Sequence, residues 1–596
     1  MMSLASNRHA LKRSVRFAAL CALSALGLFS TACGGKNKKV AAFSTDWEND
    51  RGKSINAVWE QAQGSKLPEG AAVVVGVTRD GLVARSLDGK ESWSYPHALD
   101  SRPAITGDVV LGSGNGKVFC LDAHTGKPLW SVASEGLRLR GAGDDGKLTA
   151  VSLGTDDVTK NRLLVVDRQG STVLKEEPVI PIGIPMVLGG LVFVPWGEQY
   201  VSAIDLSSGN EAGRLLSRST VSHAINVAGS LYFGERGLVR FDEKIAEASR
   251  NPDQFITVPD GKLPGNPQWL LPGTRVTPKA ATAIDKVRLY ARPSPQGDSV
   301  DSRRFAASYF RLAIGLDATS GEVRWVQHLK QDQLSVGAGI GGFVYCGADG
   351  KVTLYAAETG DPAGELNLGA PLSACVVQTA GFKVIPTRRA PVLFEQLEAA
   401  VLLEAPQLVT AQRFLLAELN KLTNPRVSQT LIRLATNPRT APALMDDART
   451  LLATRRDGAE FMLEALAVHY DFLNGVLVGP PVGPLADALA AMGEKRAAPL
   501  LAEHLNDPTD TPDDVVRAAR ALVKLAGSAE YDALKTFFVL YRAAANDPET
   551  AAAVISVAKA LIEVGGELGR SLVASAAKDP LTQRGVVKGI EPLLAD

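Results

Sequence analysis

A motif that recurs about every 40 residues between positions 57 and 397 constrains the fold of this 596-residue chain more than any other feature. Each complete copy has an apolar strand, an Asp, three residues, a Gly, three more residues and a Trp. A period of this length is typical of stacked or radially repeated units. The complete and partial copies supply these positions: Asp88 with Trp93; Asp122, Gly126 and Trp130; Asp205 with Gly209; and Asp317, Gly321 and Trp325.

The residues within each unit have the pattern of short strands joined by tight turns. Positions 73–77 read VVVGV, which is typical of a buried strand, and Asn115 and Gly116 form a dipeptide suited to a two-residue hairpin. About 40 residues is the size of one four-stranded propeller blade. We therefore predict a β-propeller over residues 54–397.

The number of units predicts eight blades. The eighth copy runs from Lys383 to Phe394 but lacks its Gly and its Trp. Val58 and Trp59, near the start of the repeat region, supply the missing end of the motif. Pairing this first segment with the last blade would close the ring and remove an open sheet edge.

The repeated residue types predict structural roles before any functional one. The Gly suits a tight turn, and the Asp carboxylate can accept hydrogen bonds from turn amides. The Trp is suited to packing between blades. We therefore interpret Trp59, Trp93, Trp130 and Trp325 as parts of the core, not as platforms for a ligand.

The hydrophobic period changes after the repeat region, from two residues to about 3.6, which predicts helices over residues 398–596. Asp507 with Pro508 and Asp547 with Pro548 recur 40 residues apart. An Asp-Pro pair ends one helix and begins the next. The pattern resembles the HEAT repeat and predicts an α-solenoid of four or five units. Such an array offers a concave surface to proteins, or it packs on the propeller and binds nothing.

The N-terminus has the pattern of a secretion signal: basic residues precede an apolar stretch at positions 17–29. Residues 30–34 resemble the bacterial lipobox, although Ser30 stands where Leu is usual. We expect residues 1–32 to be removed, Cys33 to be lipidated and residues 33–53 to form a polar tether. The alternative is an ordinary signal peptide cleaved near Ala32. Gly34 in place of Asp resembles lipoproteins sorted to the outer membrane, so we expect the protein there, facing the periplasm.

Three further cysteines, Cys120, Cys346 and Cys375, lie outside the predicted signal and lipidation site. An oxidising compartment permits disulfides without requiring them. We expect small buried hydrophobic residues at all three positions, and a bridge between Cys346 and Cys375 as the less favoured alternative.

The Leu-Asp-Ala-x-Thr-Gly-x-x-x-Trp unit resembles the repeat of pyrroloquinoline-quinone (PQQ) type propellers. A lipoprotein with eight such units resembles the BamB family of the outer-membrane β-barrel assembly machinery, over about 340 residues. The resemblance implies protein partners, namely that machinery or its clients. A HEAT-like array is not part of the family's pattern.

The sequence lacks the motifs of the enzyme classes that share this fold. It has no adjacent Cys pair, no CxxCH and no HExxH. Residues 337–342 match GxGxxG but lead into a strand, where a dinucleotide site needs a helix. The 64 basic and 64 acidic residues balance, which disfavours nucleic acid as a partner. We therefore expect no catalytic residues, no metal and no cofactor.

These observations favour a non-catalytic periplasmic scaffold that binds proteins, held at the outer membrane by its lipid, in or near β-barrel protein assembly. One alternative is an envelope adaptor for another complex, such as motility or secretion. A PQQ-dependent dehydrogenase is the less favoured alternative.

Overall fold

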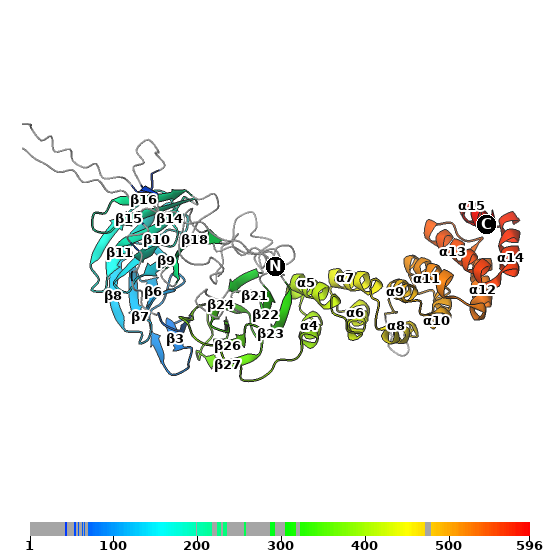
Figure 1. Ribbon diagram of the computed structural model, residues 1–596, viewed down its shortest axis with the longest axis horizontal. Coiled ribbons are helices and arrows are strands. Elements are labelled where there is room, and N and C mark those ends of the chain that lie inside the picture. Colours follow the sequence, from blue (N-terminus) through cyan, green and yellow to red (C-terminus); the bar gives the residue numbers. More distant parts are fainter. Residues whose placement is uncertain are drawn as a thin grey trace, which may run out of the picture.

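The computed structural model describes residues 42–44, 53–54, 58, 62, 65, 70–197, 199–216, 223–227, 230–234, 256–257, 287–291, 304–317, 322–470 and 478–595. Several four-stranded antiparallel sheets, arranged as propeller-like blades, are followed by a C-terminal helical region that extends as an arm (Figure 1). The predicted change from strands to helices is confirmed.

The described strands form seven sheets, numbered here as blades 1 to 7 in chain order. Blade 1 contains β28 (Ala374–Gln378), β2 (Val73–Val77), β3 (Leu82–Ser86) and β4 (Ser92–Tyr95). Blade 2 contains β5 (Ala104–Thr106), β6 (Val109–Gly114), β7 (Lys117–Asp122) and β8 (Pro128–Ala133). Blade 3 contains β9 (Arg138–Asp144), β10 (Leu148–Gly154), β11 (Asn161–Asp167) and β12 (Thr172–Glu176).

The remaining sheets follow the same order along the chain. Blade 4 contains β13 (Met186–Leu188), β14 (Leu191–Trp196), β15 (Tyr200–Asp205) and β16 (Glu211–Leu216), with β1 (Lys53–Ser54) added outside β16. Blade 5 contains β17 (His223–Val227), β18 (Ser230–Gly234) and β19 (Ile256–Thr257). Blade 6 contains β20 (Val287–Ala291), β21 (Arg304–Tyr309), β22 (Leu312–Asp317) and β23 (Val323–His328). Blade 7 contains β24 (Gln333–Gly339), β25 (Gly342–Gly347), β26 (Lys351–Ala356) and β27 (Pro362–Asn367).

The burial of the strands follows their place in a blade. All six residues of β6 are buried. In β8, at the outside of the same blade, four of the six residues are exposed. Adjacent blades cover both faces of an inner strand, which explains its continuous apolar run. Asn115 and Gly116 have φ angles of 51° and 73° and join β6 to β7 in the two-residue hairpin that their sequence predicts.

Blade 1 is completed by the last strand of the repeat region. β28 pairs with β2 and contacts both β24 of blade 7 and β5 of blade 2. The N-terminal segment lies elsewhere, because β1 pairs with β16 in blade 4. The prediction that the N-terminal segment closes the ring is therefore wrong for its described part; Trp59 lies outside the described residues.

The predicted eighth unit is also wrong. Lys383 forms only an isolated bridge with Ile340, and Phe394 is the second residue of helix α4 (Leu393–Val401). Phe394 is buried in the core of the helical region, which explains why an apolar stretch occurs here without the Gly and Trp of a blade.

A disulfide joins blade 7 to blade 1. Cys346 in β25 and Cys375 in β28 are bridged, with their Cα atoms 6.5 Å apart. The disulfide, which the sequence made the less favoured alternative for Cys346 and Cys375, is therefore the arrangement found. Cys120 is a buried free thiol whose pKa is raised by burial. The bridge covalently links the two blades that β28 brings together.

The helical region contains α4 (Leu393–Val401), α5 (Val409–Asn420), α6 (Arg426–Thr436), α7 (Pro442–Ala453), α8 (Ala459–Leu466), α9 (Val482–Met492), α10 (Ala497–His504), α11 (Pro512–Leu525), α12 (Tyr531–Tyr541), α13 (Pro548–Gly565), α14 (Glu567–Lys578) and α15 (Arg584–Ala595), with short 3-10 turns at η3 (Pro406–Leu408) and η4 (Ser528–Glu530). Within the described residues these helices form six successive pairs, from α4 with α5 to α14 with α15. The second helices of the pairs, α5 to α15, follow one another in one layer (Figure 1). The expected four or five helix pairs are therefore fewer than the six that the described residues form.

The first helix pair is attached to the outer strand of blade 6. α4 packs on β23, and the Gln396 side-chain oxygen accepts a hydrogen bond of 2.7 Å from the Val326 amide. Buried residues of β22 and β23 share one apolar core with the helices. The boundary expected between residues 397 and 398 falls inside α4. In the described part of the chain, the helices are too short or too polar to cross a bilayer.

Candidate functional site

The Asp and Gly of the repeat build a tight turn between two strands in blades 2 and 4. Asp122 Oδ1 accepts hydrogen bonds from the amides of His124 and Thr125, at 3.1 and 2.7 Å. The Gly126 amide returns to the Asp122 carbonyl at 2.8 Å, and Gly126 has a φ of 70°. Asp205 and Gly209 repeat this arrangement in blade 4, where the Gly209 amide lies 2.7 Å from the Asp205 carbonyl.

The Trp of one blade lies on the turn of the next blade. The Trp93 indole of blade 1 donates a hydrogen bond of 2.9 Å to the Ala123 carbonyl of blade 2. A Cβ added at Gly126 would come within 2.6 Å of the same ring. The Trp325 indole of blade 6 makes the corresponding bond of 2.9 Å to Ala357 of blade 7. These contacts join neighbouring blades, as the predicted structural role of the Trp requires.

Of the other predicted repeat positions, Asp88 and Trp130 are described with their side chains, whereas several others are not. Asp88 accepts hydrogen bonds from the Ser86 hydroxyl at 2.6 Å and from the Lys90 amide at 3.1 Å. These two bonds, with the Lys90 ammonium group, hold the pKa of Asp88 below its usual range. Trp130 is buried close to Gly170 of blade 3. Asp317 ends β22, but its side chain, like Gly321, Trp59 and Cys33, lies outside the described residues.

A second kind of site lies at the outer edge of blade 4, where the N-terminal segment docks. β1 adds a parallel strand to this edge, with Lys53 opposite Gly213 and Ser54 opposite Arg214. Val58, only 7% exposed, and Ala62, only 1% exposed, pack with buried residues of β13, β14 and β15. Lys53, the last residue of the expected polar tether, therefore belongs to a docked strand.

Phe43 is the aromatic anchor of this docked segment. Its ring makes an edge contact with Trp196, with ring centroids 5.9 Å apart. Trp196 also stacks on Tyr200, with ring centroids 4.3 Å apart. The neighbouring Ser44 carbonyl accepts a hydrogen bond of 2.6 Å from Arg214. Blade 4 thus contacts the segment through the Phe43 ring and through the Ser44 carbonyl.

A buried ion pair positions Arg214 for this contact. Its guanidinium group donates to both carboxylate oxygens of Glu211, with Nε 2.8 Å from Oε1. The Ser202 hydroxyl donates to the same carboxylate at 2.5 Å and accepts from the Trp196 indole at 2.8 Å. Losing one partner of a buried pair leaves an unpaired charge, which costs about 3–5 kcal/mol. The network therefore holds the Arg214 guanidinium group where it can donate to the docked backbone.

Polar residues also meet inside blade 3. Asp144, only 2% exposed, receives hydrogen bonds from Thr149 and Arg168, at 2.6 and 2.8 Å. Burial raises its pKa to about 6 despite these partners. Arg168 also contacts Asp108 of blade 2 at 2.6 Å, so the group connects neighbouring blades. Arg168 contacts both Asp144 and Asp108 between blades 2 and 3, and we therefore assign these residues a structural role.

The arrangement on blade 4 can bind an extended polypeptide by strand addition. It combines a sheet edge, an aromatic contact between Phe43 and Trp196, and an arginine that donates to a carbonyl of the added segment. Sequence reasoning missed the site because the segment around Phe43 is rich in Gly, Lys and Asn. The signal that could have found it is Phe43 itself, a large apolar residue in an otherwise polar stretch.

Comparisons with known proteins agree with a propeller of this kind. A family model described as "Outer membrane protein assembly factor BamB" matches residues 35–212 and 79–246. A curated protein of the same description from Bordetella pertussis is 25% identical over 197 residues, which are 32% of this chain and 45% of that protein. The match thus spans less than half of the relative. These similarities support a BamB-like propeller.

Solved structures are also similar over about half of the chain. BamB from Moraxella catarrhalis is 15% identical and covers 52% of this chain and 91% of its own, with a TM-score of 0.27. The computationally designed Ika8 protein is 12% identical and covers 54% of this chain and 95% of its own, with a TM-score of 0.29.

Proposed function

We propose that this protein is a non-catalytic lipoprotein of the outer membrane that binds other proteins in the periplasm, in or near β-barrel protein assembly. The similarity of residues 35–246 to an outer-membrane assembly factor supports the process. The docked segment on blade 4 supports the mode of action, because the chain itself adds a strand to a blade edge. This strand addition is the observation on which the proposal mainly rests.

Strand addition suits a scaffold for polypeptides that are still unfolded. Backbone hydrogen bonds to a sheet edge bind any extended chain, and side-chain pockets add selectivity. In the described part of the ring, β4, β8, β12 and β27 each form the outer edge of their sheets. In our proposal these edges and the loops between strands engage partners or clients.

The lipid anchor would keep these edges close to the membrane. We propose that Cys33 is acylated; two or more acyl chains suffice for stable attachment. Phe43 follows Cys33 by ten residues. An extended chain spans about 3.3–3.6 Å per residue, so Phe43 would lie within about 36 Å of the anchor.

The helical region would provide a second binding surface. We propose that its six helix pairs form a HEAT-like array whose exposed face binds protein. Two weak sites on one anchored molecule raise the effective concentration of a partner at each site. The match to the assembly-factor family ends at residue 246, which favours an envelope adaptor for another complex as the second candidate.

Metabolic labelling tests the anchor. Cells would express the wild-type chain or Cys33→Ala in the presence of an alkyne fatty acid, and their membranes would then be fractionated. We expect the wild-type protein to be labelled and to sediment with outer membrane, whereas Cys33→Ala is unlabelled and soluble. Cys120→Ala, which removes a buried thiol, is the matched control and keeps the label. An unlabelled, soluble wild-type protein would contradict the proposal.

A further inference from the structure

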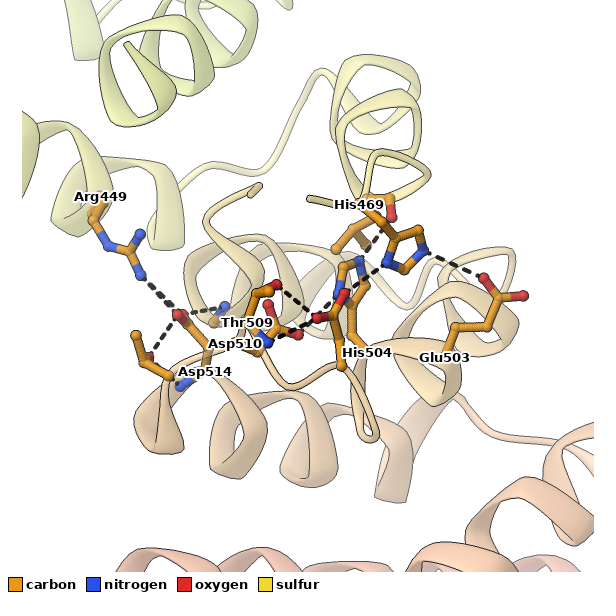
Figure 2. A network of polar contacts seen from close by, with 11 residues as sticks. Arg449, His469, Glu503, His504, Thr509, Asp510 and Asp514 are labelled. Carbon is orange, nitrogen blue, oxygen red and sulfur yellow. Dashed lines mark hydrogen bonds and ion pairs between the residues drawn. The ribbon is translucent and has the colours of Figure 1, made fainter. Parts of the chain in front are cut away.

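Two histidines and an aspartate from separate helix pairs meet in the middle of the helical region. His469 follows α8, His504 is the last residue of α10, and Asp507 lies in the turn before α11. One ligand atom of each residue lies within 4.8 Å of those of the other two. Figure 2 shows the two imidazole rings side by side above this turn; their centroids are 4.4 Å apart.

Each histidine presents one ring nitrogen to a carboxylate of the cluster. Nδ1 of His469 lies 2.9 Å from Oδ2 of Asp507, and Nδ1 of His504 lies 2.9 Å from Oδ2 of Asp510. Nitrogen and carboxylate oxygen atoms in this relation share a proton when no metal is bound. A divalent cation can replace that proton, because it accepts the lone pairs of both atoms.

The opposite ring nitrogen of His504 has the outer partner that is usual for metal-binding histidines, and that of His469 faces a carboxylate at a longer distance. Nε2 of His504 lies 2.8 Å from the Leu466 carbonyl, and Nε2 of His469 lies 3.6 Å from a Glu503 oxygen. The Leu466 carbonyl can hold the N–H at Nε2 of His504, so that Nδ1 becomes a ligand atom once a cation displaces the proton between it and Asp510. Asp507 is held as well, since its Oδ1 accepts from the Thr509 amide and hydroxyl, at 2.9 and 2.6 Å.

We propose that His469, His504 and Asp507 bind a divalent transition-metal ion of the zinc type. Imidazole nitrogens with one carboxylate are a ligand set typical of Zn²⁺, whereas Ca²⁺ and Mg²⁺ prefer oxygen alone. Zinc bonds of about 2.0–2.2 Å place two ligands of one ion within about 4.4 Å, so small side-chain adjustments complete the site.

The surroundings fit a cation that enters from solvent. His504 and Asp510 are buried, at 0% and 5% side-chain exposure, whereas the His469 side chain is 38% exposed. Asp507, Asp510 and Glu503 together offset the charge of the ion. In Figure 2 Glu503 and Asp510 lie near the two rings, and the more distant Arg449 is paired with Asp514 at 2.9 Å.

A bound ion would join successive helix pairs. His469 lies in the connection from α8 to α9, whereas His504 and Asp507 belong to the end of α10 and the turn before α11. The ion would therefore act as a structural clip between repeats and reduce their relative motion. Val468 and Tyr470, each 43% exposed beside His469, would be held in place with it.

Metal titration of the full chain tests this proposal. The protein would be treated with EDTA, dialysed and titrated with Zn²⁺ by calorimetry, and with Co²⁺ while visible absorption is recorded. We expect one equivalent of Zn²⁺ to bind with a dissociation constant in the micromolar range or below, and Co²⁺ to give the absorption of an ion with nitrogen ligands. Absence of one-to-one binding would overturn the proposal.

Matched variants identify the ligands. His469→Ala and Asp507→Asn should each weaken Zn²⁺ binding by at least about tenfold, whereas His124→Ala, which changes an exposed histidine of a blade 2 turn, should not. Circular dichroism of each variant checks that it folds. Asp507→Asn keeps the size of the side chain and therefore provides the test if His469→Ala is unstable. Equal affinity in all variants would place the metal elsewhere and overturn the assignment.

Discussion

At the scale of single residues, Gly126 combines two constraints that can be separated by experiment. Its φ of 70° and the Trp93 ring, 2.6 Å from an added Cβ, both oppose a side chain. We expect Gly126→Ala to destabilise the propeller by about 2–4 kcal/mol, the sum of a left-handed backbone and overpacking. Denaturant unfolding followed by tryptophan fluorescence measures the change.

Gly116 provides the matched control for this substitution. Its φ is 73°, but nothing lies within 4 Å of an added Cβ. Gly116→Ala should therefore cost only the backbone contribution of about 1–2 kcal/mol. Equal losses in the two variants would mean that the Trp93 contact contributes nothing to the junction between blades.

Asp144 gives the propeller a specific dependence on pH. Burial raises its folded pKa to about 6, above an unfolded value of about 3.9. The folded state therefore binds this proton more tightly, so the contribution is fully present below about pH 4 and is lost as pH rises to about 6. Relative to Asp144→Asn, the wild-type chain should lose on the order of 2–3 kcal/mol between pH 4 and pH 6.5.

Unfolding curves for both proteins across this pH range provide the measurement. The difference between the two chains isolates this one carboxyl, because all other groups titrate in both. A difference that stays constant with pH would show that the Asp144 pKa is the same in the folded and unfolded states.

Residue roles within one turn could be predicted, but their partners could not. The Asp, the Gly and the Trp act within short distances along the chain, and their spacing therefore appears directly in the sequence. That Trp93 lies on the turn around Gly126 depends on how neighbouring blades pack. Likewise, His469 and His504 are 35 positions apart and meet only through the stacking of helix pairs.

At the scale of secondary-structure elements, β28 and its disulfide hold blade 7 to blade 1. The bridge closes a loop between residues 29 positions apart. A loop of that length corresponds to about 3–4 kcal/mol in the chain-entropy treatment of disulfides. We expect the double variant Cys346→Ala with Cys375→Ala to lose this amount in denaturant unfolding under oxidising conditions.

Reduction provides the control for the disulfide prediction. Dithiothreitol should destabilise the wild-type propeller by a similar amount and leave the double variant unchanged. A wild-type chain whose stability is the same with and without reductant would contradict a stabilising bridge between these blades.

The register of β1 on β16 can be tested by cross-strand disulfides. Lys53 lies opposite Gly213, so Lys53→Cys with Gly213→Cys should form a bridge on mild oxidation. Lys53→Cys with Leu216→Cys is out of register and should form much less. Mass spectrometry of the two oxidised proteins gives the yields, and equal yields would contradict docking in this register.

The sequence distinguishes strands from helices where the hydrophobic pattern is long. It does so less well at the two ends of the repeat region. A period of two residues and one of 3.6 distinguish strands from helices. The stretch around Phe394 is short and apolar, which suits both a strand and the α4 helix, and the helical core decides between them. β1 is two residues long and polar, so only its partner strand makes it a strand.

At the scale of the whole molecule, several propeller-like blades, the added strand β1 and an arm of helices form one polypeptide (Figure 1). The segment docks on blade 4, whereas the arm begins on blade 6. The membrane anchor that we propose and the helical surface would therefore act at different places on the ring. This arrangement fits a scaffold that holds a partner beside the membrane.

The identity of the partner tests this account most directly. Photo-crosslinking residues placed in living cells on the outer strands of the blades, followed by purification and mass spectrometry, would capture what the scaffold binds. The account predicts that components of the outer-membrane β-barrel assembly machinery, or unfolded barrel proteins, dominate the crosslinked products. Products that contain neither, from a folded and membrane-attached protein, would contradict it.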